Sequence, residues 1–340
     1  GVNNIAIGSN TMDALTTGIC NIAIGVNALG VSTTGCHNIA IGDRAMGCCT
    51  ATGVRNIGIG LQAAQKITSG YDNVAMGYGP MGAMTTGQCN IAFGASALAA
   101  STTGCFNIAL GTNTMGGSIT TGIDNIAIGT QAADALTTGI CNIALGRHAL
   151  GASTTGCLNI AIGELALGTG VLACGGSGQA QNNIAIGESA LTAMTTGSNN
   201  IGIGLTAGLT LTTGTDNIAI GRLAFEASCD GADNVAIGRH ALGTTVNDAD
   251  CNVAVGYYAL GNGDVSGADN IAFGTTSMDA LTSGGDNVAI GRDALGASTT
   301  GCANIAIGCK ALGGAVTTSL NNIAIGTSAM DALTTGICNV

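Results

Sequence analysis

The sequence predicts an all-β protein, a parallel β-solenoid of about 19 coils with about 17 residues in each coil. Three observations support this prediction. An Asn followed by Ile or Val recurs at 20 positions from Asn4 to Asn339, and 13 of the 19 intervals equal the one from Asn4 to Asn21. Large apolar and small residues alternate directly after that Asn, which is the pattern of a strand. Four positions after the Asn stands a Gly in all 19 complete repeats, where it can turn the chain.

Each repeat has the approximate form N-I-A-I-G-x-x-A-L-x-x-x-T-T-G-x-x. We expect the two large residues, one and three positions after the Asn, to face the core. The x-x-Ala-Leu segment predicts a second short strand, and Thr-Thr-Gly closes the circuit. One such coil cannot bury its apolar side alone, so copies must stack in parallel and share a continuous core.

The repeats run through the whole chain, which predicts a single continuous array over residues 1–340. The interval from Asn159 to Asn183 is longer than all others and predicts an enlarged loop near 168–182. Residues 2–22 and 320–340 agree at 16 of 21 positions, so we expect a fragment of a longer repeat array. We also expect the repeated Asn side chains to stack as a hydrogen-bonded ladder. Its first members are Asn21, Asn38, Asn56, Asn73 and Asn90.

Composition excludes several classes of protein. Charged residues make up 8% of the chain, where an ordinary domain carries about 25%. With 46% hydrophobic residues the chain is too apolar to be a disordered coil. The net charge is −11 with eight Lys plus Arg, which argues against a nucleic-acid partner. The apolar runs are far shorter than a spanning helix needs, so this segment is not expected to insert into a membrane.

The small residue between the two large ones suggests self-association. It is Ala in 17 repeats and Gly in two, Gly58 and Gly202. We expect this Ala/Gly face to point away from the core, as a smooth apolar strip suited to the approach of another sheet. The interface would then include Ala127 and Ala219.

The sequence offers little support for catalysis. His37, His148 and His240 have no Ser, Cys or Asp partner that recurs beside them. Glu164 and Glu188 fall in one outward column, and glycoside hydrolysis needs two carboxylates that flank a substrate groove. We therefore predict that the chain is not an enzyme and that it uses no cofactor.

Two binding functions remain as weaker alternatives. Asp248, Asp250 and Asp264 are the best candidates for calcium, but turn capping explains loop carboxylates equally well, and we predict no metal site. The repeated Thr pairs suggest an ice-binding solenoid. Adjacent Thr side chains on a strand point to opposite sides, which disfavours a flat hydroxyl array.

Cysteines recur in pairs almost one repeat apart, in the turns of adjacent coils. Stacked turns are about 4.8 Å apart, which lies within the Cα range of a disulfide. Buried free thiols are the alternative. The candidate disulfides join Cys20 to Cys36, Cys89 to Cys105 and Cys141 to Cys157.

The motif Asn-Ile-Ala-Ile-Gly followed by x-x-Ala-Leu resembles the head repeats of trimeric autotransporter adhesins, which also occur in phage tail fibres. The likeness covers all 19 complete repeats, although the usual unit of that family is shorter. It implies a left-handed parallel β-roll, a parallel homotrimer, and a location outside the cell, on a cell surface or a virion fibre.

We therefore expect an extracellular fibrous segment with a structural or adhesive role and a receptor on a host surface. The alternative is a filament or sheath protein that is built by solenoid stacking and binds no receptor.

Overall fold

The fold is an all-β parallel β-solenoid in which each sequence repeat forms one coil, as predicted. A computed structural model describes residues 1–172, 180–243, 249–263, 265–314 and 318–340. In these residues every strand has three residues and there is no helix. The chain divides into two compact units, Gly1–Cys174 and Gly175–Val340. Whether they form one continuous array stays a prediction, and residues 173–179 of the predicted enlarged loop lie outside the described ranges.

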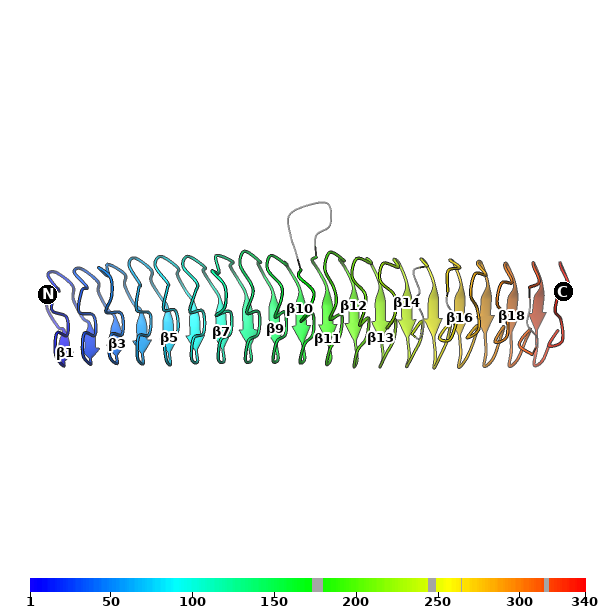
Figure 1. The fold of residues 1–340 in the computed structure, drawn as a ribbon, viewed down its shortest axis with the longest axis horizontal. Helices are drawn as coiled ribbons and strands as arrows, with labels where there is room; N and C mark the ends of the chain where they lie inside the picture. Colours follow the sequence, from blue (N-terminus) through cyan, green and yellow to red (C-terminus); the bar gives the residue numbers. More distant parts are fainter. Residues whose placement is uncertain (173–179, 244–248, 264, 315–317) are drawn as a thin grey trace. The chain divides into compact units, whose positions relative to one another are not determined.

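In each unit the strands follow one another in chain order, one in each coil (Figure 1). The first unit contains β1 (Ile5–Ile7), β2 (Ile22–Ile24), β3 (Ile39–Ile41), β4 (Ile57–Ile59), β5 (Val74–Met76), β6 (Ile91–Phe93), β7 (Ile108–Leu110), β8 (Ile126–Ile128), β9 (Ile143–Leu145) and β10 (Ile160–Ile162). The second unit contains β11 (Ile184–Ile186), β12 (Ile201–Ile203), β13 (Ile218–Ile220), β14 (Val235–Ile237), β15 (Val253–Val255), β16 (Ile271–Phe273), β17 (Val288–Ile290), β18 (Ile305–Ile307) and β19 (Ile323–Ile325).

Neighbouring strands within a unit pair in parallel, residue for residue. In the β2–β3 pair, Ile22 lies opposite Ile39, and Ala23 lies opposite Ala40. Coils with one extra residue keep the same register, as in the β3–β4 pair, where Ala40 lies opposite Gly58. The extra residue is therefore absorbed in the turns, and each column of the repeat becomes a straight row along the stack.

The direction of the strand side chains is the reverse of the prediction. In every strand except the terminal β1 the central Ala or Gly is buried, with Ala23 and Ala127 both 0% exposed, whereas the flanking large residues are half-buried or exposed. Ile128 is 42% exposed and Phe93 is 55% exposed. The predicted Ala/Gly interface, Ala219 included, is thus part of the core, and the Ile/Val/Phe side chains form the outer face.

The narrow interior of the coil explains this reversal. Its large core side chains come from the turn that follows the strand, where Leu29 and Met46 are at most 1% exposed. These side chains reach the strand of the next coil. A Cβ added to Gly58 would lie 3.0 Å from the terminal methyl of Met46. Only Ala or Gly therefore fits at the inward strand position.

The predicted second strand is also wrong, because the segment is a run of tight turns. In the β2 coil, Asn27 and Leu29 adopt left-handed backbone conformations, with φ of 57° and 50°. The N–H of Asn27 donates to the carbonyl of Ser9 in the preceding coil at 3.0 Å. The N–H of Leu29 donates to the carbonyl of Ala45 in the following coil at 3.0 Å. Backbone groups are thus paired along the stack without extended geometry, which offsets the cost of about 1 kcal/mol for a non-Gly residue in this region.

The Gly that ends each strand is required by the close contact between coils. Gly25 has φ of 132°, and a Cβ there would lie 2.5 Å from the carbonyl oxygen of Gly42 in the next coil. No side chain can occupy that space, so the row of glycines sets how closely the coils stack.

Candidate interaction surface

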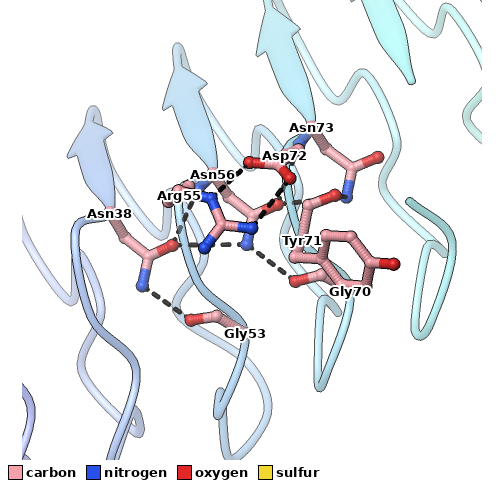
Figure 2. Close-up of polar contacts among 8 residues, drawn as sticks. All are labelled: Asn38, Gly53, Arg55, Asn56, Gly70, Tyr71, Asp72 and Asn73. Carbon is pink, nitrogen blue, oxygen red and sulfur yellow. Dashed lines mark hydrogen bonds and ion pairs between the residues drawn. The ribbon is translucent and has the colours of Figure 1, made fainter. Parts of the chain in front are cut away.

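The repeated Asn residues form a buried ladder that ties each coil to itself and to the next. The Oδ1 atom of Asn56 accepts from the backbone N–H of Asn73 at 3.1 Å and from its Nδ2 at 3.0 Å. Across its own coil, Asn56 donates from Nδ2 to the carbonyl of Gly70 at 2.8 Å (Figure 2). Asn21, Asn38, Asn73 and Asn90 make the corresponding cross-coil bonds to Gly35, Gly53, Gly87 and Gly104. The ladder is therefore a structural device, and its polar atoms are occupied.

The residue before each Asn lies at the surface and has positive φ, as at Arg55 (58°) and Asp72 (56°). These two side chains form a two-bond ion pair across adjacent coils, at 2.7 Å and 2.9 Å (Figure 2). Hydrogen bonds from Arg55 lower the pKa of Asp72. Arg55 also lies 5.9 Å from the centre of the Tyr71 ring. This column illustrates how side chains that are one repeat apart in the sequence become neighbours on the solenoid surface.

The most extended surface feature is the strand face, which we define as the residues one and three positions after each repeat Asn. Every one of these positions in the 19 strands holds Ile, Val, Leu, Met or Phe, and none is polar or charged. Its side chains are only partly covered; Phe93 and Phe273 are each 55% exposed, and Ile271 is 43% exposed. Soluble proteins rarely leave a continuous apolar row open to water.

The strand face is large enough to act as an interface. The ten strands of the first unit, at about 4.8 Å each and about 10 Å wide, give a footprint of about 480 Å². The nine strands of the second unit give a similar value. The two footprints add up to about 900 Å², which is comparable to the roughly 800 Å² per partner that stable protein interfaces bury. Columns of mostly polar residues border the face on both sides, as a polar rim borders an interface.

The six cysteines of the predicted disulfides are free thiols in the structure. They occupy two neighbouring columns. Cys20 lies directly before an Asn, and Cys36 lies one position earlier in the next coil. The Cys36 thiol lies 3.3 Å from the carbonyl of Thr34, and Cys105 and Cys157 make the same local contact. Disulfide pairing of these residues stays a prediction.

The remaining candidates do not gather into a reactive site. His37 and His148 lie on separate coils of the first unit, and Glu164 forms an ion pair with Arg147. Of the calcium candidates, Asp248 and Asp264 lie outside the described residues, and Asp250 accepts from the backbone N–H of Ala232 at 2.8 Å. Among the residues that the structure describes, no three His, Cys, Asp or Glu side chains are placed to hold a metal ion.

In several coils the first Thr of the pair, or the residue in its place, uses its hydroxyl within the fold. The hydroxyl of Thr68 donates to the carbonyl of Thr85 at 3.0 Å, and Thr85 donates to Thr102 at 3.1 Å. Thr137 and Thr282 do the same toward the coils that follow them. A hydroxyl that is engaged in this way is not free to match an ice lattice, so these first Thr residues do not favour an ice-binding surface.

One open groove of about 500 Å³ runs across the turns of the first coils. Its polar side chains are Asn10, Asp13, Asn27, Arg44, Cys48 and Gln65. None of them is buried. The groove therefore lacks the desolvated, convergent polar groups of an active site.

The described residues include no helix that is long and apolar enough to cross a membrane. No protein-family model matches the chain, and no curated protein is significantly similar to it. The chain is shown to be a β-solenoid repeat protein, and its strand face is the feature from which a function can be argued.

Proposed function

We propose that this chain is a segment of an extracellular fibrous protein that assembles with copies of itself and serves as a structural or adhesive fibre. The observation that carries the proposal is the strand face. It presents two large apolar side chains in every coil, and a copy of the same chain presents a face with the same coil spacing. Parallel copies in register would bury both faces along their length.

A parallel homotrimer, as the resemblance to adhesin head repeats implies, would bring three strand faces together around one axis. The Ala/Gly residues would then pack within each chain and the Ile/Val/Phe residues between chains. The exposed outer columns would remain available for a receptor on a host surface, on a cell-surface or virion fibre.

The second candidate is a filament or sheath that is built from stacked solenoids and binds no receptor. The regular coil spacing favours it, because a parallel stack can extend by adding coils. The two candidates differ in how mass depends on concentration. A filament grows without limit as concentration rises, and a trimer does not.

Light scattering after size-exclusion chromatography tests the proposal. The expected mass is three times the 32.7 kDa of one chain and constant over a hundredfold dilution series. A mass that rises continuously with concentration would support the filament. A mass of one chain at every concentration would refute self-association.

A further inference from the structure

Three successive coils of the second unit carry a distinctive group of side chains directly after their strands. β13, β14 and β15 (Figure 1) each end in the turning Gly, and the next residues are Arg222, Arg239 and Tyr257. Equivalent residues of adjacent coils stand about 4.8 Å apart, so the three side chains form one row. All three are exposed, Tyr257 by 44%. We call this row the Arg-Tyr patch.

Ring and cation contacts order the patch. The guanidinium carbon of Arg239 lies 5.5 Å from the centre of the Tyr257 ring. Tyr258 meets Tyr257 edge to face and stacks on His240, with 4.6 Å between ring centres in both pairs. Burial, with the nearby charges of Arg239 and Arg222, lowers the pKa of His240, so the stacked imidazole is neutral at pH 7. Side chains that are ordered in advance lose less entropy when a ligand binds.

Neither arginine of the patch forms one of the ion pairs that the described residues make. The ion pairs of the described residues are Arg55–Asp72, Arg147–Glu164 and Arg292–Asp293. Arg222 and Arg239 belong to none of them, although they are neighbours in one column. Glu226 is near enough to Arg222 to feel its charge, but burial raises the pKa of Glu226 and the two form no ion pair. Like charges that face each other across strands are unfavourable, and an anion bound between them would relieve the repulsion.

The chemistry of the row indicates the ligand. Guanidinium groups bind planar or tetrahedral oxyanions through paired N–H donors. The exposed Tyr257 ring beside them offers a flat apolar surface with a polar tip. We propose that Arg222, Arg239 and Tyr257 form a site for an acidic saccharide, a pyranose that carries a carboxylate or a sulfate ester. The oxyanion lies between the two guanidinium groups, and the sugar ring lies against Tyr257.

The surroundings favour a saccharide over a nucleic acid. A nucleic-acid strand needs a row of cations that follows successive phosphates. The column of the patch instead carries Glu188 two coils before Arg222, and Arg292, which is paired with Asp293, two coils after Tyr257. Two adjacent cations that form no ion pair match one acidic group on a ligand that is otherwise neutral.

This inference rests on the proposed function in one respect, the use of the site in attachment. The patch begins just after the strand face ends, on the rim of the proposed interface. Each copy in an assembly would therefore carry one site at its outer edge. Weak binding at each site is then strengthened when several sites engage one polysaccharide.

Calorimetric titration of the full chain with tetrasaccharides tests the site. The probes are a hyaluronan tetrasaccharide with carboxylates only, a heparin-derived tetrasaccharide with sulfates as well, and neutral maltotetraose. We expect the acidic probes to bind and maltotetraose not to bind. Arg222→Gln and Arg239→Gln should each weaken binding about tenfold, because each removes a charge-assisted hydrogen-bonding partner. Affinity should also fall as NaCl screens the charges.

Arg147→Gln is the matched control, because Arg147 occupies the same column and is already paired with Glu164. It should leave binding unchanged, and thermal melting checks that each variant is folded. The site is refuted by the absence of binding to either acidic probe at millimolar concentration, by equal binding of maltotetraose, or by equal effects of the three arginine substitutions. Tighter binding of oligo-dT would replace the saccharide with a nucleic acid. Mass is measured in parallel: a single chain that binds would refute the assembly alone, and an assembled chain that does not bind would refute the site alone.

Discussion

Two neighbouring residues of β8 provide a direct test of which side of the strand forms the interface. Ala127 is 0% exposed and Ile128 is 42% exposed. Lysine placed at Ala127 must enter the core, whereas lysine placed at Ile128 projects from the strand face. The structure therefore predicts that Ala127→Lys unfolds the local coils and that Ile128→Lys prevents assembly.

The two substitutions should differ strongly in their effect on folding. At the position equivalent to Ala127, a Cβ on Gly58 would already lie within 3.0 Å of Met46, so a lysine chain finds no room. Overpacking of about 1–3 kcal/mol adds to several kcal/mol for an unpaired buried ammonium, in total about 5 kcal/mol or more. Ile128 is about half-buried, so its loss costs the single chain about 1 kcal/mol, part of which the lysine methylenes recover.

Light scattering and circular dichroism separate the two effects, and hydrogen exchange at β7, β8 and β9 locates them. Ile128→Lys should give a folded single chain, and Ala127→Lys should lose amide protection in these three strands. Ile128→Val is the control that keeps the face apolar and should retain the assembled mass. The reasoning is refuted if Ala127→Lys melts like the natural chain and only its assembly is lost, because Ala127 would then lie outside the core.

Three further predictions concern the core, the ladder and the thiols. Asn73→Ala should destabilise the fold by about 3 kcal/mol in chemical denaturation, because it leaves the N–H of Asn90 and the carbonyl of Gly87 without their partner. The surface control Thr130→Ala should cost under about 0.5 kcal/mol, because Thr130 is exposed and has no left-handed backbone conformation. Gly202→Ala should destabilise by about 1–3 kcal/mol although Ala is the usual residue there, since its Cβ would lie 2.7 Å from Leu191 Cγ. Gly58→Ala has its closest contact, at 3.0 Å, with the flexible end of Met46, and the next at 3.2 Å with the carbonyl oxygen of Ala63, so it should cost less than Gly202→Ala. Thiol titration of the oxidised, denatured chain should find at most eight of 14 thiols free if the three predicted disulfides form, and 14 reactive thiols would reject the pairing.

The parallel stack could be predicted from the sequence because its columns carry strong physical requirements. A buried amide such as that of Asn56 needs partners at a fixed spacing, and only stacked copies supply them. Gly25 stands where the next coil leaves no space for a side chain. These requirements recur in every coil, so the period and the register can be read directly.

The direction of the strand could not be read in the same way. Alternation of Ile22, Ala23 and Ile24 establishes that they face opposite sides, but not which side is the interior. The rule that large residues face inward fails here because Leu29 fills the core from the turn. The turn itself resembles a strand in its pattern, and its left-handed residues are unfavourable locally. Hydrogen bonds to the adjacent coils outweigh the local cost of the left-handed conformation. The sequence of a single repeat does not reveal these bonds, because their partners lie in other coils.

The columns of the repeat have different roles, and these roles determine which positions can bind a ligand. The Asn, Gly and Ala columns are committed to hydrogen bonds and packing, so they are nearly constant from coil to coil. The columns on either side of the strand face have exposed side chains and vary freely, from Arg55 and Asp72 in one to Arg239 and Tyr257 in the other. A ligand can distinguish one stretch of the solenoid from the next only through these columns. Aligning the coils places Arg222 beside Arg239 from sequence alone, but the ring stacking that orders the patch becomes visible only in three dimensions.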